Sequence, residues 1–529
     1  MHCMWSRYAL DALGRCQSTL FGGGWRRGRE RGSIFILSMV ALAVLLLLGA
    51  ISVQLAVQSL DRAVKERDSA VAFNLAESAA DCAEAWLRAQ SAPPLDYGPI
   101  DPLGGEQTLG TGTYRAIIYP DAGNPGAWLK SYTIVGTGAS ARGGASRRVI
   151  LKVQEQSFAL YSYFTDQERS SVTNGTIWFY ARDRLYGPVH TNDRFHISWD
   201  STSADPIFYD TVSSTGSSVD WLPRAPRNTR EWRRVLQGGR DALALGTDRI
   251  PLPQSTDRQR TAAWGDEVGF PTTTGVYLPT SGSSVRAGIY VRGDSQIRFS
   301  VDVPTGDQVI TITQGSNTTT ITVDLDGNQT TVEDGTAGSP YSYIGIPNGV
   351  IYSTGNITSL SGMLADNYDN GSVILQRNAW TIATDVNAGK DITITGDLTY
   401  QTPPMSDRPP SHPNNLRAPT LGLVAEDVVV ASSCPNELTI DAVILAGGEN
   451  TSNGSFYYAG WQTIKRNNLH VLGGIIQKKR GPVGTFDPDR NIHLTGYNKD
   501  YHYDARMVDA PPPFFPTTGQ YDVKSWQYR

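Results

Sequence analysis

The sequence predicts a mainly β protein carried on one long N-terminal α-helix, with a small antiparallel sheet after the helix and a right-handed β-helix, or β-solenoid, as the body. Three observations predict this fold. Residues 32–60 form a run of 29 residues without Asp, Glu, Lys or Arg, and helix-favouring residues continue beyond it. The 529 residues include 53 Gly and 30 Pro but only 18% charged residues, which is typical of short strands that end at turns. Short apolar runs then recur at intervals that indicate stacked coils.

The first 32 residues form a basic leader ahead of the apolar run. They contain six arginines, at positions 7, 15, 26, 27, 29 and 31, against Asp11 and Glu30, a net charge of +4 that leaves −9 for the rest of the chain. The sequence leaves open whether the chain starts at Met1 or Met4. Because basic flanks stay on the cytoplasmic side of a membrane, we expect residues 1–32 in the cytoplasm and the body on the opposite side of the cytoplasmic membrane.

The apolar segment from Ser33 to Val53 is long enough to span a bilayer, because 21 helical residues at about 1.5 Å each reach about 32 Å. A cleaved secretory signal would have a shorter apolar core followed by a small-residue cleavage site, whereas here the helical pattern continues to Gln90, before prolines at 93 and 94. One helix over residues 33–90 is therefore predicted. Its second half carries an apolar stripe for packing, formed by Leu60, Val64, Val71, Leu75, Ala79, Cys82 and Trp86.

The basic residues, Gly32, the apolar run and the alanine-rich stretch AFNLAESAADCAEAWL together resemble the N-terminal segment of type IV pilin-like proteins, specifically the PilX-type minor pilins. In that family a prepilin peptidase cuts after the glycine. The resemblance therefore implies cleavage between Gly32 and Ser33, with Ser33 as the methylated mature N-terminus. The alternative is a plain signal anchor, in which Gly32 only precedes a transmembrane helix.

The fifth mature position departs from the pilin pattern. Most pilins have a glutamate there, which is thought to neutralise the terminal amine of a neighbouring subunit, but this chain has Leu37. A buried carboxylate is costly without a positive partner, so its absence suits a subunit with no neighbour above it. Minor pseudopilin K of type II secretion, a tip component, also lacks this glutamate. Leu37 therefore favours a tip or initiation role.

Three alternating segments at 113–120, 128–138 and 146–156 predict an antiparallel meander, so that residues 91–156 form a small head on the helix. Residues 157–480 are predicted as the solenoid body, with a hairpin insert near 304–336, and residues 481–529 as a Pro- and aromatic-rich strap over its end. The spacing of glycines at 293, 355 and 396 corresponds to coils of about 20 residues. Segments 186–197, 473–486 and 496–527 also resemble an uncharacterised extracytoplasmic domain family that commonly follows PilX-type stems.

The strongest candidate for a polar site is the sequence HTND, with His190, Asn192 and Asp193. A hydrolase or lyase would need such a base and carboxylates in one groove, but Asn and Asp also serve turns, and that structural role is favoured here. No metal-ligand spacing or cofactor motif occurs, so no metal or cofactor is predicted. The four cysteines form no framework, and pairing of Cys82 with Cys434 is left open.

The leading hypothesis is a non-enzymatic minor pilin-like subunit of a type IV pilus or related pseudopilus, with a tip, assembly-priming or adhesion role. Its expected partners are other pilin subunits, the pilus assembly machinery, the prepilin peptidase and the inner membrane. Nucleic acid is excluded as a partner of the acidic body. A second hypothesis is a membrane-anchored β-helix enzyme or binder that acts on envelope polysaccharide, and surface polysaccharide is kept as a partner. The third is a static envelope scaffold.

Overall fold

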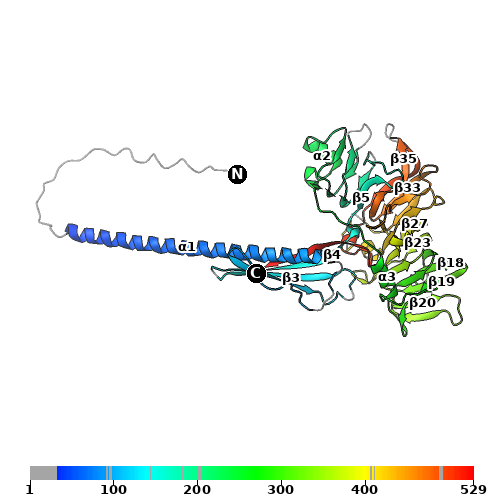
Figure 1. Ribbon diagram of the computed structural model, residues 1–529, viewed down its shortest axis with the longest axis horizontal. Coiled ribbons are helices and arrows are strands. Elements are labelled where there is room, and N and C mark those ends of the chain that lie inside the picture. The colour runs from blue at the N-terminus through cyan, green and yellow to red at the C-terminus, as the bar shows by residue number, and fades with distance from the viewer. Residues whose placement is uncertain are drawn as a thin grey trace.

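The computed structural model describes residues 33–90, 93–94, 98–124, 127–142, 144–180, 183–199, 205–405, 408–409, 411–487 and 492–529. The basic leader and Gly32 lie outside the described residues. The molecule consists of a long helical stem, a small sheet packed on one end of the stem, and a large β-rich body beyond that sheet (Figure 1).

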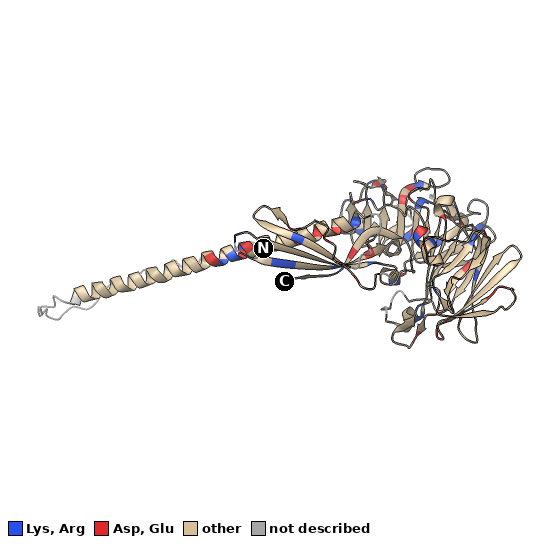
Figure 2. Cartoon of the chain, turned by 60° about the horizontal axis from the view of Figure 1, so that its bottom comes forward, with Lys and Arg blue, Asp and Glu red and all other residues tan. Residues whose placement is uncertain are grey.

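The stem is the helix α1 (Ser33–Arg88), a continuous element of 56 residues and thus about 84 Å long. Its first half projects away from the rest of the protein with all described side chains exposed (Figure 1). No charged residue colours this half in Figure 2, and the first along α1 is Asp61. In the part of the chain that the structure describes, α1 alone is long and apolar enough to cross a membrane. The predicted long N-terminal helix is confirmed, and its length and composition fit a single-pass membrane anchor.

A five-stranded antiparallel sheet, here called the head sheet, covers the second half of α1. The three strands predicted after the helix are present, and each pairs with the next. Strands at both ends of the chain complete the sheet, whose order is β1 (Gln107–Leu109), β2 (Gly112–Pro120), β3 (Ser131–Ser140), β4 (Ser146–Ser157) and β37 (Thr517–Tyr528).

The last strand, β37, ties the C-terminus to the head sheet by pairing antiparallel with β4. Tyr521 and Trp526 therefore lie on the head, not on a strap over the end of the body. Tyr521 packs against Tyr132 of β3, and Trp526 packs against Phe73 of the stem. Because the chain leaves the head after β4 and returns as β37, the body is joined to the head at two points.

Two large sheets make up the body, and most of their strands run parallel to their neighbours. The first is an 11-stranded sheet in the order β12 (Leu243–Leu245), β10 (Val212–Ser214), β7 (Val189–Thr191), β5 (Tyr163–Ser170), β34 (Ile475–Arg480), β31 (Val443–Ala446), β28 (Thr420–Ala425), β26 (Ala379–Thr384), β22 (Val350–Ser353), β16 (Ile289–Arg292) and β13 (Gly275–Tyr277).

The second is a 15-stranded sheet. Its main path is β14 (Thr280–Ser281), β15 (Ser284–Val285), β21 (Tyr341–Ile344), β20 (Gln329–Glu333), β19 (Asn317–Asp324), β18 (Gln308–Gln314), β17 (Ser295–Val301), β23 (Ile357–Leu364), β27 (Ile392–Tyr400), β30 (Leu438–Asp441), β33 (Lys465–Leu472), β36 (Ile492–His502) and β35 (Gly484–Asp487), with β29 (Val428–Val430) and β32 (Phe456–Tyr458) beside β27.

The predicted right-handed β-helix is wrong: the body consists of open, mixed sheets. In the first sheet β5 lies between β7 and β34, so an early strand of the body pairs with a late one and residues about 300 positions apart become neighbours. The second sheet contains the antiparallel series β17 to β21, and β13 is antiparallel in the first. The prediction failed because the spacing of glycines indicates only where short strands end at turns. It does not indicate which distant strands pair with one another.

The main hydrophobic core lies between the two sheets and takes isoleucines and leucines from both, such as Ile444 of β31 and Ile440 of β30. A second core covers the opposite face of the 11-stranded sheet, where Phe164, Tyr352 and Leu445 pack under Leu252 and under α3 (Asp257–Trp264). His190 and Asn192, two of the polar residues singled out from the sequence, lie along this second layer.

Smaller elements fill the connections between these strands. The remaining helices are α2 (Thr229–Val235), α4 (Pro413–Arg417) and four 3₁₀ turns at Phe158–Leu160, Arg240–Ala242, Val386–Ala388 and Ala505–Val508. The remaining strands pair two by two: β6 (Arg184–Leu185) with β9 (Ile207–Phe208), β8 (His196–Ser198) with β11 (Asp220–Leu222), and β24 (Tyr368–Asp369) with β25 (Ile374–Gln376).

Candidate functional site

Two regions carry the residues relevant to function, the stem with its junction to the head and the polar cluster around His190. On the stem, Ser33 is the first residue of α1. Leu37 lies one turn further along and its side chain is 70% exposed, so none of the residues that the structure describes covers it.

The junction between stem and head is built from alanines on the helix and glycines on the sheet. A Cβ atom placed on Gly136 of β3 would lie 2.2 Å from the Ala76 carbonyl oxygen, and one placed on Gly138 would lie 2.2 Å from the Ala72 carbonyl oxygen. Both distances are far below the 3.4 Å of ordinary contact. The backbone of β3 therefore lies directly against the backbone of α1, which only glycine permits.

The face of α1 that packs on the head differs from the predicted stripe. Leu75 and Ala79 are buried as expected, but Cys82 is exposed and Leu60 and Val64 extend below the head with exposed side chains. Small residues pack instead, because they allow the helix to approach the glycines of β3. The buried positions are Asp68, Ala72, Leu75, Ala76, Ala79, Ala80, Ala83 and Leu87. Cys82 and Cys434 are both free thiols.

His190 lies in the middle of β7, and both of its ring nitrogens are engaged within the chain. Nδ1 is 2.8 Å from the Ser213 hydroxyl oxygen, and Nε2 is 3.1 Å from the Asn192 side-chain oxygen. The ring stacks on Phe164 with 5.1 Å between the ring centres. Burial lowers the pKa of His190 to about 4, so the imidazole is neutral at neutral pH.

Asn192 fastens a distant segment of the chain over this layer. Its side-chain nitrogen donates to the Ile250 carbonyl at 2.6 Å, and the Ile250 amide donates to its side-chain oxygen at 2.9 Å. These two hydrogen bonds resemble the pair exchanged by two residues of neighbouring strands, but here one partner is a side chain. They hold residues 248–253, here called the covering segment, across the ends of β5 and β7. The Asn192 side-chain nitrogen also donates to the Asp166 carboxylate at 3.0 Å.

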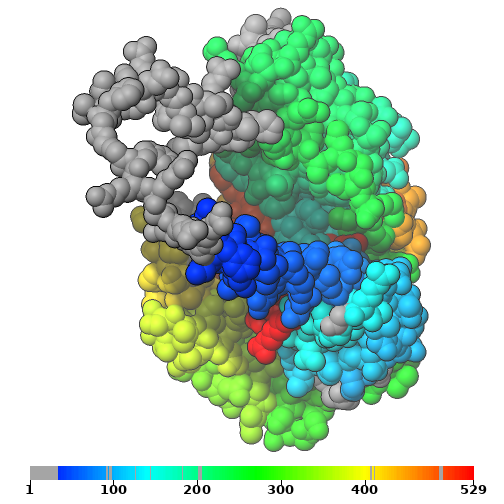
Figure 3. Space-filling model, turned by 90° about the vertical axis from the view of Figure 1, so that its left-hand side faces the viewer, coloured from blue at the N-terminus to red at the C-terminus, as the bar shows by residue number. Residues whose placement is uncertain are grey.

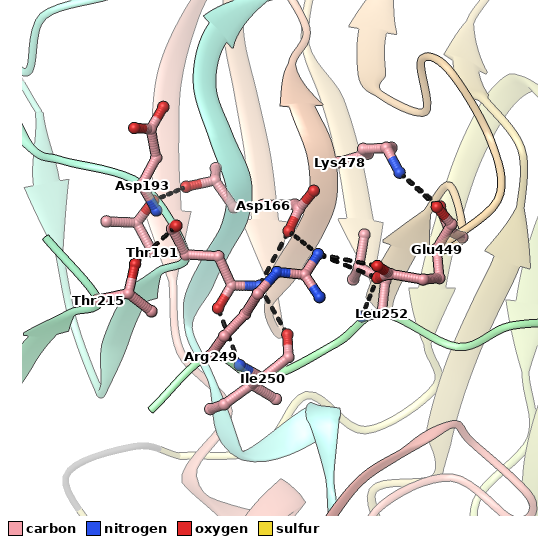
Figure 4. Close-up of polar contacts among 12 residues, drawn as sticks. Asp166, Thr191, Asp193, Thr215, Arg249, Ile250, Leu252, Glu449 and Lys478 are labelled. Carbon is pink, nitrogen blue, oxygen red and sulfur yellow. Dashed lines mark hydrogen bonds and ion pairs between the residues drawn. The ribbon is translucent and has the colours of Figure 1, made fainter. Parts of the chain in front are cut away.

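Arg249 lies between two carboxylates and fixes the other side of the covering segment (Figure 4). It donates to Asp166 of β5 at 2.8 Å and lies 3.0 Å from the Glu449 carboxylate, in the loop after β31. Glu449 also accepts the Leu252 amide at 3.2 Å, and Lys478 donates to the Glu449 carbonyl at 2.8 Å (Figure 4). The carboxylates thus bind groups of the chain itself.

Asp193 is separate from this network and serves the turn after β7. One carboxylate oxygen accepts the Glu168 amide at 3.0 Å, and the other accepts the Arg194 amide at 2.8 Å. The structure therefore brings His190 and Asn192 together and directs Asp193 elsewhere. Within the described ranges, no group of three or more His, Cys, Asp or Glu side chains is arranged to hold a metal ion.

This arrangement is suited to fastening the covering segment over the second core, and it offers no exposed base beside a free carboxylate. Sequence reasoning found His190 and Asn192 but missed Asp166, Arg249 and Glu449. These residues are separated by up to 283 positions in the chain, from Asp166 to Glu449. Only the pairing of β5 with β34, and of β34 with β31, brings them side by side.

Comparison with known proteins adds a family match and a structural similarity. The family described as "Domain of unknown function (DUF4900)" matches residues 129–217, from the start of β3 to just past β10. Among solved structures, the competence-associated pilin ComZ from Thermus thermophilus is similar over 88% of this chain and 98% of its own, with 13% identity and a TM-score of 0.29. No curated protein matches the sequence.

Proposed function

We propose that this protein is a pilin-like subunit of a type IV pilus or related pseudopilus, and that it acts without catalysis by displaying its body outside the cytoplasmic membrane. The observation that carries the proposal is the division of α1 into two halves. The first half is apolar, uncharged and exposed along its length, whereas the second half packs alanines against the glycines of the head sheet. A helix of this kind can lie first in lipid and then against the helices of neighbouring subunits.

The plain signal-anchor hypothesis accounts for a spanning segment but does not require the rest of this design. A simple anchor needs about 20 apolar residues and then a linker. Here the same helix continues without a break into a closely packed sheet. This continuity makes stem and head one rigid unit, which favours transfer of the whole helix from the membrane into a filament.

A position at the tip, with an assembly-priming or adhesion role, is supported by two features. Leu37 replaces the glutamate that would meet a neighbour above, and it is exposed for contact with an apolar surface. The body is also much wider than the stem when seen along the helix, with residues near 200–250 on one side and residues near 300–400 on the other (Figure 3). Such a body repeated at each level of a closely packed shaft would collide with its copies.

The proposal is tested by blocking the processing step. Gly32→Val should abolish cleavage and retain the chain in the cytoplasmic membrane, while Gly28→Val, a matched change in the same leader, should leave both cleavage and surface display intact. The readouts are the size of the mature protein and its amount in the sheared surface fraction. Equal processing and display of both variants would contradict the proposal and favour a static anchor. Immunogold labelling at filament ends, as opposed to labelling along the length, tests the tip position.

A further inference from the structure

The body contains a hollow lined by aromatic rings at the seam between its first and last strands. Its volume is about 180 Å³, and its wall includes Tyr163 of β5, Trp178 in the segment after β5, and Tyr497 and Tyr501 of β36. This volume is smaller than that of a drug-sized site, which starts at about 300 Å³. The hollow therefore has room for one ring-sized group.

A second, smaller hollow adjoins the first along the same seam. Its volume is about 70 Å³, and it shares Tyr163 and Tyr501 with the larger hollow while adding Tyr186. Tyr186 stacks on Tyr209 at 4.3 Å and on His502 at 5.0 Å between ring centres, which extends the aromatic surface away from the main hollow. A ligand with more than one ring can follow this row.

Three charged residues, Asp183, Arg480 and Lys499, line both hollows, and each has an ionic partner. The smaller hollow also has Arg184, which donates to two backbone carbonyls, and Asp500, which lies 3.0 Å from His502. Arg480 lies 3.2 Å from Glu168, and both side chains are at most 5% exposed. Lys499 lies 2.9 Å from Asp183 at the edge between the two hollows. Burial alone would raise the pKa of Asp183, but Lys499 and Arg480 hold it below its ordinary value, so Asp183 is ionised and neutralises Lys499. An ionic ligand would have to break one of these pairs, which is costly in a partly buried site.

Amide and hydroxyl groups supply the polar part of the lining. Asn498 and Thr485 line the main hollow together with Gln477, whose side chain is fixed by bonds to the Tyr163 hydroxyl and the Phe456 amide. A wall that combines ring faces with neutral donors and acceptors fits a ligand with apolar ring faces and hydroxyl groups around its edge. Asn498 donates to Asn468 and Thr485 bonds to Thr495, and the oxygen atoms of both side chains can still accept a hydrogen bond from a ligand hydroxyl.

We propose that this seam binds a neutral saccharide, with one pyranose ring in the larger hollow and a neighbouring ring of the same chain reaching the smaller one. The inference concerns the body and is independent of how the stem assembles. Loss of saccharide binding would therefore leave the outcome of the Gly32 experiment unchanged.

The test uses the full chain in detergent micelles and isothermal titration calorimetry with four hexasaccharides. Three are neutral, cellohexaose, maltohexaose and chitohexaose, and one is anionic, hexagalacturonate. We expect at least one neutral probe to bind with one site per chain and hexagalacturonate to bind at least about tenfold more weakly. Trp178→Ala should weaken the neutral probe about tenfold or more, as truncation of a central aromatic contact does. Trp178→Phe should restore most of the affinity because a ring face is retained.

The matched control is Trp526→Ala, which removes an exposed tryptophan from the head sheet, away from the hollows, and should leave binding unchanged. If Trp178→Ala loses its folded circular dichroism spectrum, Asn498→Leu replaces it, since this change keeps the volume and removes the amide. No binding of any neutral probe, equal binding of hexagalacturonate, or full affinity in Trp178→Ala or its replacement Asn498→Leu would overturn the proposal.

Discussion

The contact between Gly136 and α1 makes a sharp prediction about what holds the stem to the head. In Gly136→Ala the new methyl group would lie 2.2 Å from the Ala76 carbonyl oxygen and 2.9 Å from the Ala80 amide nitrogen. Both atoms belong to the helix backbone, so no side chain can rotate away. Reaching ordinary contact at 3.4 Å requires the helix and strand to separate by about 1.2 Å at this point.

The size of this separation determines how much stability the head loses. A gap of about 0.5–1 Å already removes a quarter to a half of the attraction between packed atoms, and overpacking of a core costs about 1–3 kcal/mol. The gap would extend under Ala76 and Ala80, which are at most 1% exposed. We therefore expect Gly136→Ala to destabilise the head by about 3 kcal/mol, the upper end of that range.

Hydrogen exchange of the β3 amides, followed by mass spectrometry, measures this local stability in the full chain. A loss of about 3 kcal/mol corresponds to exchange about a hundredfold faster. The control is Gly98→Ala, the same chemical change at a glycine with nothing within 4 Å of the added methyl group. Equal protection of β3 in the two variants would refute the backbone-to-backbone packing of stem and head.

Three further outcomes concern buried groups in the body and an exposed cysteine on the stem. Burial lowers the pKa of His190 to about 4, below its ordinary value of 6.5. The contribution of the neutral ring to the free energy of unfolding is therefore complete above pH 6.5 and falls by up to about 3 kcal/mol as the pH drops to 4. His190→Gln should remove this part of the pH dependence of urea unfolding. Arg480→Met leaves Glu168 buried without its ion pair and should cost about 3–5 kcal/mol in urea unfolding, whereas Arg480→Met with Glu168→Gln should recover a large part of the loss. A membrane-impermeant maleimide on intact cells should label the exposed Cys82 and not Cys434, because Cys434 is buried and burial raises its pKa to about 11. A Cys82→Ser variant labelled as strongly as the unchanged protein would contradict this.

The stem could be predicted from the sequence because its signals are local. A run without charges and a break at Pro93 define a helix whatever the rest of the chain does, and the three head strands show the alternation of apolar and polar residues. Part of the helix face that packs was missed because the stripe was assigned from apolar residues that recur at three, four and seven positions, most of them large. Gly136 and Gly138 instead require small side chains opposite them, which Ala72, Ala76 and Ala80 provide.

The body was rightly predicted as β-rich, but the predicted right-handed β-helix was wrong because the architecture depends on pairing between distant strands. The regular spacing of glycines indicated coils of constant length, but the chain places β5 beside β34 and returns to the head as β37. The same pairing creates the contacts of Arg249 with Asp166 and Glu449, and no pattern within a short stretch of the sequence predicts these contacts. His190 and Asn192 could be found because they lie in one short stretch, although their role in fastening the covering segment required the structure.

The mature N-terminus is the measurement that tests the central claim most directly. Mass spectrometry of the protein, recovered separately from the membrane and from the sheared surface fraction, identifies its first residue. A pilin-like stem predicts Ser33, methylated on its amine, in the surface fraction. A protein that begins at Met1 or Met4, or that is cut beyond Val53, would contradict a stem transferred from the membrane into a filament.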